Sequence, residues 1–282
     1  MEKIGNVITN ENLEQFTLWL RTEERSEGTV ENYLRNLKSL KNWLDEEELT
    51  RETASKWKEH LISEGYNPVT VNSMIAAVNT YSRFAGCGFV IGFLKIQRKL
   101  YRDDSRELTQ KEYEKLVETA EKDGNERMAL LMETIAATGI RVSEVKYITV
   151  EAASSRRTQV SLKRKIRDIM LPGKLCKKLL KYAKKNKIAS GEIFITGSGK
   201  GMSRKQIWAS MKVICRKAGV AETKVFPHNL RHLFARVYYR IYKDVAKLAD
   251  LLGHSSIETT RIYLLSTGEE HGRQLEKLGI VR

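Results

Sequence analysis

The sequence has few of the residues that cross-link a chain or anchor it in a membrane. Only three of its 282 residues are cysteines, and Cys87, Cys176 and Cys215 lie far apart and away from histidines. This spacing argues against a disulfide framework or a zinc site. No run approaches the roughly eighteen apolar residues that span a bilayer, and no N-terminal run is typical of a signal peptide. We therefore expect a cytoplasmic protein with reduced thiols and no membrane contact.

Proline is equally scarce, with three residues in the whole chain. Apolar residues recur at helical spacing through the first hundred positions and predict four helices, which together form a small helical module. Their expected ranges are Asn12–Arg21, Thr29–Leu44, Arg51–Ser63 and Pro68–Phe84. The second helix carries a basic row of Arg35, Lys38 and Lys41, which suits either a solvated face or a DNA contact.

A length of 282 residues with 41% apolar content favours two globular domains, each able to bury a core. The polar segment 100–106 is the best candidate for the connection between them. The expected division is therefore a domain at 1–99, a linker at 100–106 and a second domain at 107–282. Thr109 and Glu112 have the spacing of a capping box, which predicts the start of the first helix in the second domain.

The second domain combines helices with short strands. The apolar run Met128–Ala137 predicts a buried helix that leads to Gly139 and Arg141. Strand patterns follow at Tyr147–Val150, Gln159–Leu162 and Ile166–Leu171, with a tight turn near Lys163–Lys165. The chain is therefore expected to be mainly α with a small antiparallel β-sheet.

Charge is distributed unevenly along the chain. Residues 1–104 contain 14 basic and 16 acidic side chains, whereas residues 105–282 contain 36 basic and 19 acidic ones. A positive field concentrated in one domain attracts polyphosphates and binds a DNA backbone by releasing its counterions. A solvated basic surface that aids solubility is the alternative explanation.

Four motifs in the second domain contain residues suited to attack on a phosphodiester. They are Thr138–Glu144, Pro227–His232, Leu252–Ser256 and Thr259–Tyr263. The guanidinium groups of Arg141 and Arg231 can grip phosphate oxygens in a fork. The imidazoles of His228 and His254 exchange protons near neutral pH, and the phenol of Tyr263 can act as a covalent nucleophile.

This order of residues resembles the catalytic set of the tyrosine recombinases, also called the phage-integrase family. The flanking Ala-Thr-Gly-Ile-Arg and Leu-Gly-His-Ser-Ser, and the nine residues from His254 to Tyr263, strengthen the resemblance. It covers the whole chain and implies the two-domain architecture of Xer proteins. A helical SAM-like core-binding domain would clamp DNA, and an α/β tyrosine recombinase catalytic domain would follow.

The resemblance implies a role for each catalytic residue and requires no metal or other cofactor. Arg141 and Arg231 would stabilise the transition state, and His228 would accept the proton of Tyr263. His254 would donate a hydrogen bond to the phosphate. A hairpin lysine would protonate the departing 5′ oxygen; Lys163 fits the hairpin best, with Lys165 as the alternative. Glu144, three residues after Arg141, is expected to order that arginine or cap a helix and to take no part in proton transfer.

The resemblance also implies a function and partners. We expect a site-specific DNA recombinase that forms a 3′-phosphotyrosyl intermediate, integrating or excising a mobile element. A Xer-type resolvase of chromosome or plasmid dimers is the alternative; a non-cutting DNA-binding protein and a type IB topoisomerase are further ones. The implied partners are double-stranded DNA with paired inverted half-sites and a homotetramer on two duplexes. Accessory DNA-bending factors are possible further partners.

Three other patterns have simpler interpretations. The sequence Gly197–Gly201 lacks the residues of a phosphate-binding P-loop and predicts a turn before a helix capped at Ser203. The lysines of 174–187 recur at helical spacing and predict a solvated helix face. Residues Glu269–Leu278 predict a short helix too small to be stable alone, which would dock either on its own domain or on a neighbouring protomer.

Overall fold

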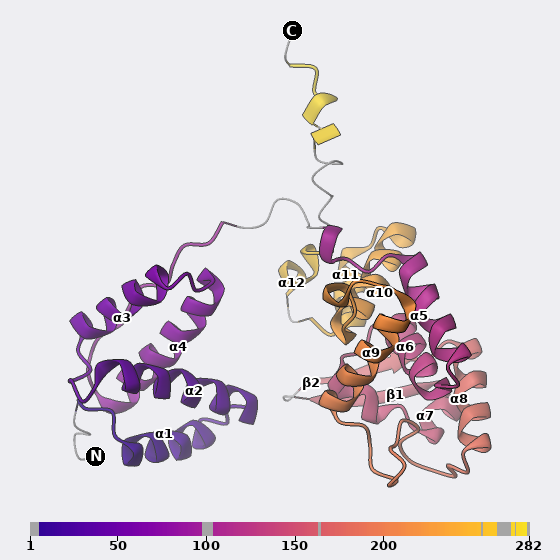
Figure 1. The fold of residues 1–282 in the computed structure, drawn as a ribbon, viewed down its shortest axis with the longest axis horizontal. Coiled ribbons are helices and arrows are strands. Elements are labelled where there is room, and N and C mark those ends of the chain that lie inside the picture. Colours follow the sequence, from indigo (N-terminus) through magenta and orange to yellow (C-terminus); the bar gives the residue numbers. More distant parts are fainter. Residues whose placement is uncertain are drawn as a thin grey trace. The chain divides into compact units, whose positions relative to one another are not determined.

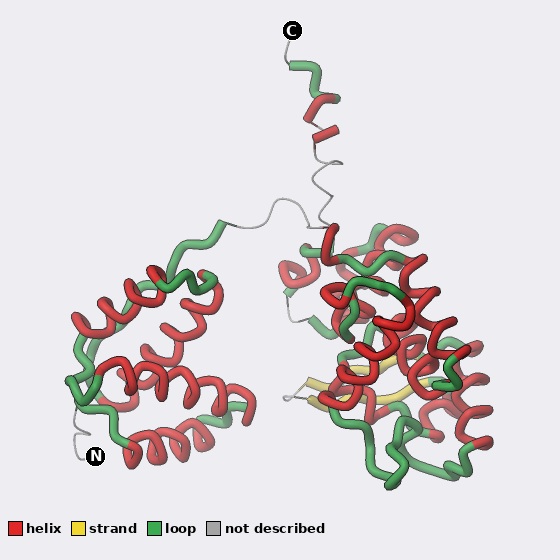
Figure 2. Tube along the Cα trace, viewed as in Figure 1, coloured by secondary structure: helices red, strands yellow, loops and turns green. Residues whose placement is uncertain are grey.

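The protein is described here by a computed structural model that covers residues 6–97, 104–162, 165–254, 256–263, 272–273 and 275–280. The chain divides into two compact units, residues 1–98 and 99–282 (Figure 1). Helices dominate both, and the strands belong to the second unit (Figure 2). The expected fold class, mainly α with a small antiparallel sheet, is confirmed.

The first unit contains the four predicted helices. They are α1 (Asn10–Thr22), α2 (Glu27–Leu44), α3 (Arg51–Ser63) and α4 (Pro68–Ala85). Local sequence fixes their ends: Pro68 occupies the first turn of α4, and Gly86 ends that helix with a φ of 72°, which glycine adopts without strain. The helices bury one face each around Phe16, Trp57 and Tyr81.

The second unit begins with a short 3₁₀ helix and contains eight α-helices and two strands among its described residues. In order they are η1 (Asp104–Arg106), α5 (Gln110–Lys122), α6 (Glu126–Thr138), η2 (Val142–Tyr147), α7 (Val150–Ser155), β1 (Arg157–Leu162), β2 (Lys165–Met170), α8 (Gly173–Lys185), α9 (Arg204–Ala218), η3 (Glu222–Lys224), α10 (Pro227–Tyr242), α11 (Val245–Leu252) and α12 (Ile257–Arg261). The predicted capping box is present, because Thr109 Oγ1 accepts from the Glu112 amide and Glu112 Oε2 accepts from the Thr109 amide.

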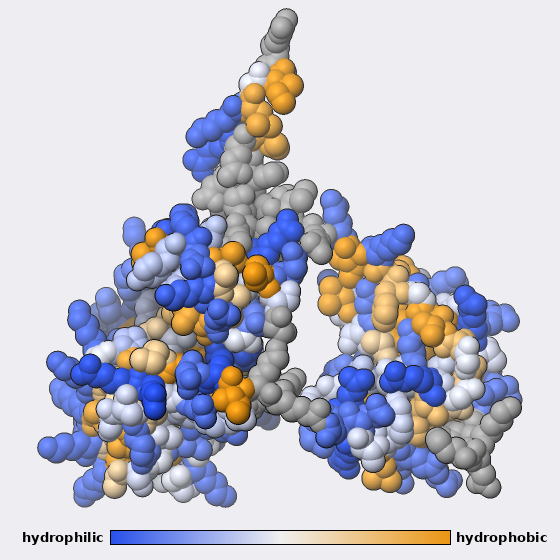
Figure 3. Space-filling model, turned by 180° about the vertical axis from the view of Figure 1, so that it is seen from behind, coloured by the Kyte–Doolittle hydropathy of each residue, from blue (hydrophilic) through white to orange (hydrophobic). Residues whose placement is uncertain are grey.

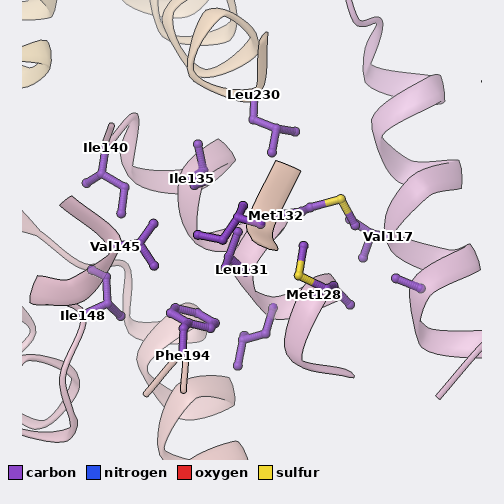
Figure 4. Packing of buried hydrophobic residues seen from close by; sticks show 14 of the residues in the cluster. Val117, Met128, Leu131, Met132, Ile135, Ile140, Val145, Ile148, Phe194 and Leu230 are labelled. Atoms are coloured by element: carbon purple, nitrogen blue, oxygen red, sulfur yellow. The ribbon is translucent and has the colours of Figure 1, made fainter. Parts of the chain in front are cut away.

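Helix α6 forms the centre of the second core. It is apolar on almost every side, as the sequence predicts for a buried helix, and it is surrounded by other helices. Figure 4 shows Met128, Leu131, Met132 and Ile135 of this helix among side chains of other elements, with Leu230 of α10 nearby. Because α6 and α10 share this core, their positions are fixed relative to each other.

The two strands form an antiparallel hairpin in which Leu162 pairs with Lys165. The prediction of a strand at Tyr147–Val150 is wrong, because Tyr147 ends η2 and Val150 begins α7. Only Thr149 makes an isolated bridge, to Glu192. The Thr149 hydroxyl caps α7 by accepting from the Ala152 amide. The β-branched residues Thr149 and Val150 therefore begin a helix and do not form a strand.

Two of the simpler sequence patterns are confirmed. Ser203 caps α9 by accepting from the Gln206 amide, directly after the glycine-rich turn. In α8, Leu175 and Leu179 are buried while the lysines lie on the opposite face, where Lys178 and Lys185 form ion pairs with Glu133 and Glu126 at 2.6 Å.

Hydrophilic side chains cover much of the visible surface of each unit, with scattered apolar residues between them (Figure 3). None of the helices in the described part of the chain is both long enough and apolar enough to cross a membrane.

Candidate active site

Arg141 stands at the junction between α6 and η2. Helix α6 ends at Gly139, which has a φ of 64° and lies so close to α10 that a Cβ atom would come within 2.5 Å of Phe234. Glycine is therefore required for both its backbone conformation and the close packing. Two residues later, Arg141 precedes η2 and donates from Nη2 to the Gly253 carbonyl at 3.3 Å. Its side chain is 39% exposed, so it can reach a ligand.

Glu144 holds the guanidinium and the backbone amide of Arg141 through hydrogen bonds. Its side chain is only 1% exposed, and both of its carboxylate oxygens are used. Oε1 accepts from Arg141 Nη1 at 3.0 Å, and Oε2 accepts from the Arg141 amide at 2.7 Å. The structure thus gives Glu144 the ordering contact with Arg141 that the sequence predicts.

Arg167 is a site residue that sequence reasoning did not select. It lies on β2, and its Nη2 donates to Glu144 Oε2 while its Nη1 donates to the Leu251 carbonyl at 2.5 Å. The guanidinium therefore joins the hairpin to Glu144 and to the backbone just before His254. Burial lowers the pKa of Arg167, an effect that the Glu144 carboxylate opposes. The only signal in the sequence was one more basic residue in a crowded hairpin.

Helix α10 carries His228 and Arg231 on one side of its first turn. Pro227 occupies the first position of this helix, where a missing amide hydrogen costs nothing. Arg231 is 1% exposed; its Nη1 donates to the Gly139 carbonyl and its Nη2 to the Leu252 carbonyl at 2.6 Å. Burial and the nearby Arg141 lower its pKa to about 10, which leaves it charged at neutral pH.

His254 follows the end of α11 and is held through both ring nitrogens. Arg231 Nη2 lies 2.9 Å from Nε2, and Thr260 Oγ1 lies 2.8 Å from Nδ1. Because an arginine can only donate, Nε2 accepts and Nδ1 carries the proton that points toward Thr260. Burial and the nearby Arg231 lower the pKa of His254 to about 4, so the ring is neutral at pH 7.

Tyr263 follows α12 and packs into the same cluster. It is 6% exposed, and its ring stacks on His254 with centroids 6.1 Å apart. Its ring also makes a T-shaped contact with the His232 ring, with centroids 4.9 Å apart. Burial raises the pKa of the phenol, whereas the positive charges of Arg231 and Arg141 lower it. The site is closed in this structure, in the sense that both Tyr263 and Arg231 are buried from solvent.

A cavity of about 340 Å³ lies beside Arg141 and the start of α10. Arg141, His228 and Arg231 line it, together with Arg204 and Trp208 of α9. The pKa of His228 falls to about 4 because packing desolvates the ring and because His232 and the nearby arginines disfavour a positive charge on it. A cavity with three arginines in its wall is suited to an anion such as a phosphate.

The structure therefore brings together five of the six predicted residues. They are Arg141, His228, Arg231, His254 and Tyr263. The sixth, Lys163, lies outside the described residues, and only the backbone of its alternative, Lys165, is described, as the first residue of β2.

Comparison with known proteins places this geometry in a family. Residues 106–270 match the model of the phage integrase family, and residues 13–86 match the N-terminal SAM-like domain of phage integrases. The chain is 28% identical over 283 residues to the tyrosine recombinase XerA of Pyrococcus furiosus, covering 97% of this chain and 96% of the relative.

Solved structures share the fold. The integrase of transposon Tn1549, in complex with transposon right-end DNA, matches with a TM-score of 0.69 and 14% identity, over 95% of this chain and 99% of that one. A lambda integrase tetramer bound to a Holliday junction matches with a TM-score of 0.71 and 19% identity, over 92% and 78% respectively.

The protein thus belongs to the phage integrase family. It is a tyrosine recombinase with two domains, a SAM-like N-terminal domain and a catalytic domain, and hence a DNA strand-transferring enzyme.

Proposed function

We propose that this protein cleaves and rejoins DNA at specific sites through a covalent bond between Tyr263 and a 3′ phosphate. The observation that carries the proposal is that Arg141, His228 and Arg231 line one cationic cavity, while His254 contacts both Arg231 and Tyr263. Two arginines can clamp the non-bridging oxygens of a phosphodiester and stabilise the charge of the transition state.

In the proposed reaction the Tyr263 oxygen attacks phosphorus while the bond to the 5′ oxygen breaks. The phenol proton passes to His228, and the hairpin lysine, Lys163 or Lys165, donates a proton to the departing oxygen. A free phenol is only about one part in a thousand ionised at pH 7, and burial raises the pKa of Tyr263 further. The arginines are therefore needed to stabilise the phenolate as well as the phosphate.

The closed arrangement adds a requirement to this mechanism. Arg231 and Tyr263 are buried, and Nε2 of His254 accepts from Arg231. A phosphate that engages Nη2 of Arg231 would compete with His254 for this donor. His254 could then donate a hydrogen bond to the phosphate, as the family resemblance implies. DNA binding would thus assemble the catalytic geometry.

The proposed partners are double-stranded DNA with paired inverted half-sites and three further copies of the chain. The lambda integrase tetramer on a Holliday junction supports this proposal through its shared fold. For the biological role, movement of a mobile element is one candidate, which the fold of the transposon integrase supports. Resolution of DNA dimers is the other, and the full-length similarity to a Xer recombinase favours it.

In the decisive experiment, a duplex that binds the full-length protein is first selected from a randomised DNA library. The selected duplex is then synthesised with a nick near the expected cleavage position. Incubation and denaturing electrophoresis should then show a slow-migrating protein–DNA adduct. Specific binding without an adduct would instead indicate a non-cutting DNA-binding protein. Relaxation of a supercoiled plasmid that lacks the selected sequence would indicate a topoisomerase.

A second experiment separates the two biological roles. A plasmid with two directly repeated copies of the selected site tests resolution, and a pair of plasmids with one site each tests integration. Resolution without integration favours the Xer-type role, and stable integration favours the mobile-element role.

A further inference from the structure

Residues 106–108, near the start of the catalytic unit, are hydrogen-bonded to α10 close to the proposed nucleophile. One face of α10 presents Asn229, His232 and Arg236 to residues 106–108. Asn229 Nδ2 donates to the Arg106 carbonyl at 2.7 Å, and Arg236 Nη2 donates to the Leu108 carbonyl at 2.5 Å. These contacts hold the backbone on both sides of Glu107.

Glu107 lies at the centre of this contact. Its side chain is 18% exposed, and its Oε2 accepts from Arg236 Nη1. Its Oε1 lies 3.8 Å from Nδ1 of His232. At this distance the contact is electrostatic and not a hydrogen bond, and it places the Nδ1 side of the ring toward the carboxylate.

His232 in turn lies between two residues of the proposed reaction. Its ring contacts the Tyr263 ring in a T-shaped arrangement, with centroids 4.9 Å apart and an interplanar angle of 77°. It also meets the His228 ring at 4.6 Å and 63°. Tyr263 also stacks on His254 at an interplanar angle of 17°. The tyrosine ring therefore contacts two histidines, of which only His254 belongs to the predicted catalytic set.

We propose that Glu107 and His232 are positioning residues that hold Tyr263 in line for attack. This inference rests on the proposed function. Glu107 fixes the His232 ring, the His232 ring fixes the Tyr263 ring, and Arg236 secures Glu107. Since Glu107 directly follows the connection between the two units, the same contacts couple the entry of the chain into the catalytic unit to the placement of its nucleophile.

Three substitutions separate positioning from simple stability. His232→Phe keeps the ring but removes Nδ1; His232→Asn keeps a donor near the Nδ1 position; Glu107→Gln removes the charge. Glu112→Gln is the matched control, because Glu112 pairs with Lys224 at 2.9 Å and is 27% exposed, but none of its contacts reaches Tyr263. Melting temperature and affinity for one half-site are measured for every variant.

The first-order rate of adduct formation on a nicked duplex, at saturating protein, is the main readout. Misplacing a reactive group by about 1 Å can cost about a hundredfold in rate. We expect His232→Phe and Glu107→Gln to slow adduct formation about 10- to 100-fold, with half-site affinity within about twofold of wild type. His232→Asn should recover part of the rate. The Glu107→Gln, His232→Phe double variant should be no slower than His232→Phe.

A 5′-bridging phosphorothiolate identifies the step affected, because its sulfur leaves without needing a proton. If His232 positions the nucleophile, His232→Phe stays slow on this substrate; recovery to the wild-type rate would place its role at the leaving group and overturn the proposal. Rates for His232→Phe and Glu107→Gln that match Glu112→Gln would also overturn it. A wild-type protein that forms no adduct would instead contradict the proposed function itself.

Discussion

Arg231 donates from Nη2 to Nε2 of His254 at 2.9 Å, so this ring nitrogen has a hydrogen-bond donor in the closed site. Nδ1 of the same imidazole lies 2.8 Å from Thr260 Oγ1, which fixes the tautomer. A ring that accepts at Nε2 cannot donate to a phosphate from that atom. The hydrogen bond between Arg231 and His254 therefore has to break before His254 can donate to a phosphate. A phosphate that binds Arg231 at Nη2 would compete for this hydrogen bond.

Tyr263→Phe should abolish the covalent adduct and leave DNA affinity nearly unchanged. The substitution removes one oxygen and no charge, and the aromatic contacts of Tyr263 with His232 and His254 can persist. A nicked duplex analysed by denaturing electrophoresis measures the adduct, and a gel-shift titration measures affinity. Equal adduct yields from the variant and the wild type would place the nucleophile elsewhere.

Arg141→Ala and Arg231→Ala should each lower the cleavage rate by at least about a hundredfold, the usual loss when one transition-state donor is removed. Their effects on stability should differ. Arg231→Ala leaves the carbonyls of Gly139 and Leu252 without a buried donor, which costs about 1–3 kcal/mol each. Arg141 is 39% exposed and should cost less.

Single-turnover cleavage and urea unfolding measure the two effects of the arginine substitutions. A chelator provides a control, since the arginines supply the positive charge that a metal provides in other nucleases. Cleavage should be the same with and without EDTA. Loss of cleavage in EDTA that magnesium restores would contradict the mechanism.

Glu144→Ala should destabilise the protein strongly. The carboxylate is 1% exposed and pairs with both Arg141 and Arg167, so its removal leaves two guanidinium groups without a counter-charge. Breaking a buried pair in this way typically costs about 3–5 kcal/mol. Urea unfolding at pH 7 checks the value, with Glu112→Gln as a control for a less buried pair. A loss below about 1 kcal/mol would show that the pairs contribute little.

The unfolding free energy should fall as the pH is lowered from about 6.5 toward 4. His228 and His254 have pKa values of about 4 in the folded chain, against about 6.5 when unfolded. In this window the unfolded chain binds more protons, so acid favours unfolding. Urea unfolding at pH 5.0 and 7.0 measures the difference. The double variant His228→Gln, His254→Gln should show a shallower dependence, and an unchanged one would contradict the lowered pKa values.

Truncation after Ser266 should spare binding of one protomer to a half-site but disrupt cooperative assembly and recombination. Much of the predicted helix Glu269–Leu278 lies outside the described residues, but Leu275 and Leu278 are described and are 55% and 62% exposed. These apolar side chains need a surface, which we expect a neighbouring protomer to supply. Gel-shift titration of a duplex with two half-sites tests this, and undiminished cooperativity with intact recombination would indicate docking within one chain.

Local sequence was sufficient for most helices of this protein. Capping residues and apolar spacing mark α3 and α5 with little ambiguity, since Thr50 and Thr109 satisfy the first amides of their own helices. The family-specific order of arginine, histidine and tyrosine likewise predicted a set of catalytic residues, five of which the described structure brings close together. Local patterns failed at Thr149, because a β-branched residue suits a strand and a helix cap equally well, and packing decided between them.

Contacts between distant segments were decided only by the tertiary structure. Arg167 contacts Glu144 and Leu251, and Glu107 contacts His232 and Arg236. These partners lie so far apart in the sequence that no periodic pattern of residues could predict the contacts. A basic residue in a hairpin and an acidic residue after a linker look like ordinary surface charges in the sequence. The sequence alone thus predicted the groups that we propose for the chemistry. The contacts that support these groups depend on how the folded core brings α10, β2 and residues 106–108 together, because burial and partner geometry exist only once the chain has packed.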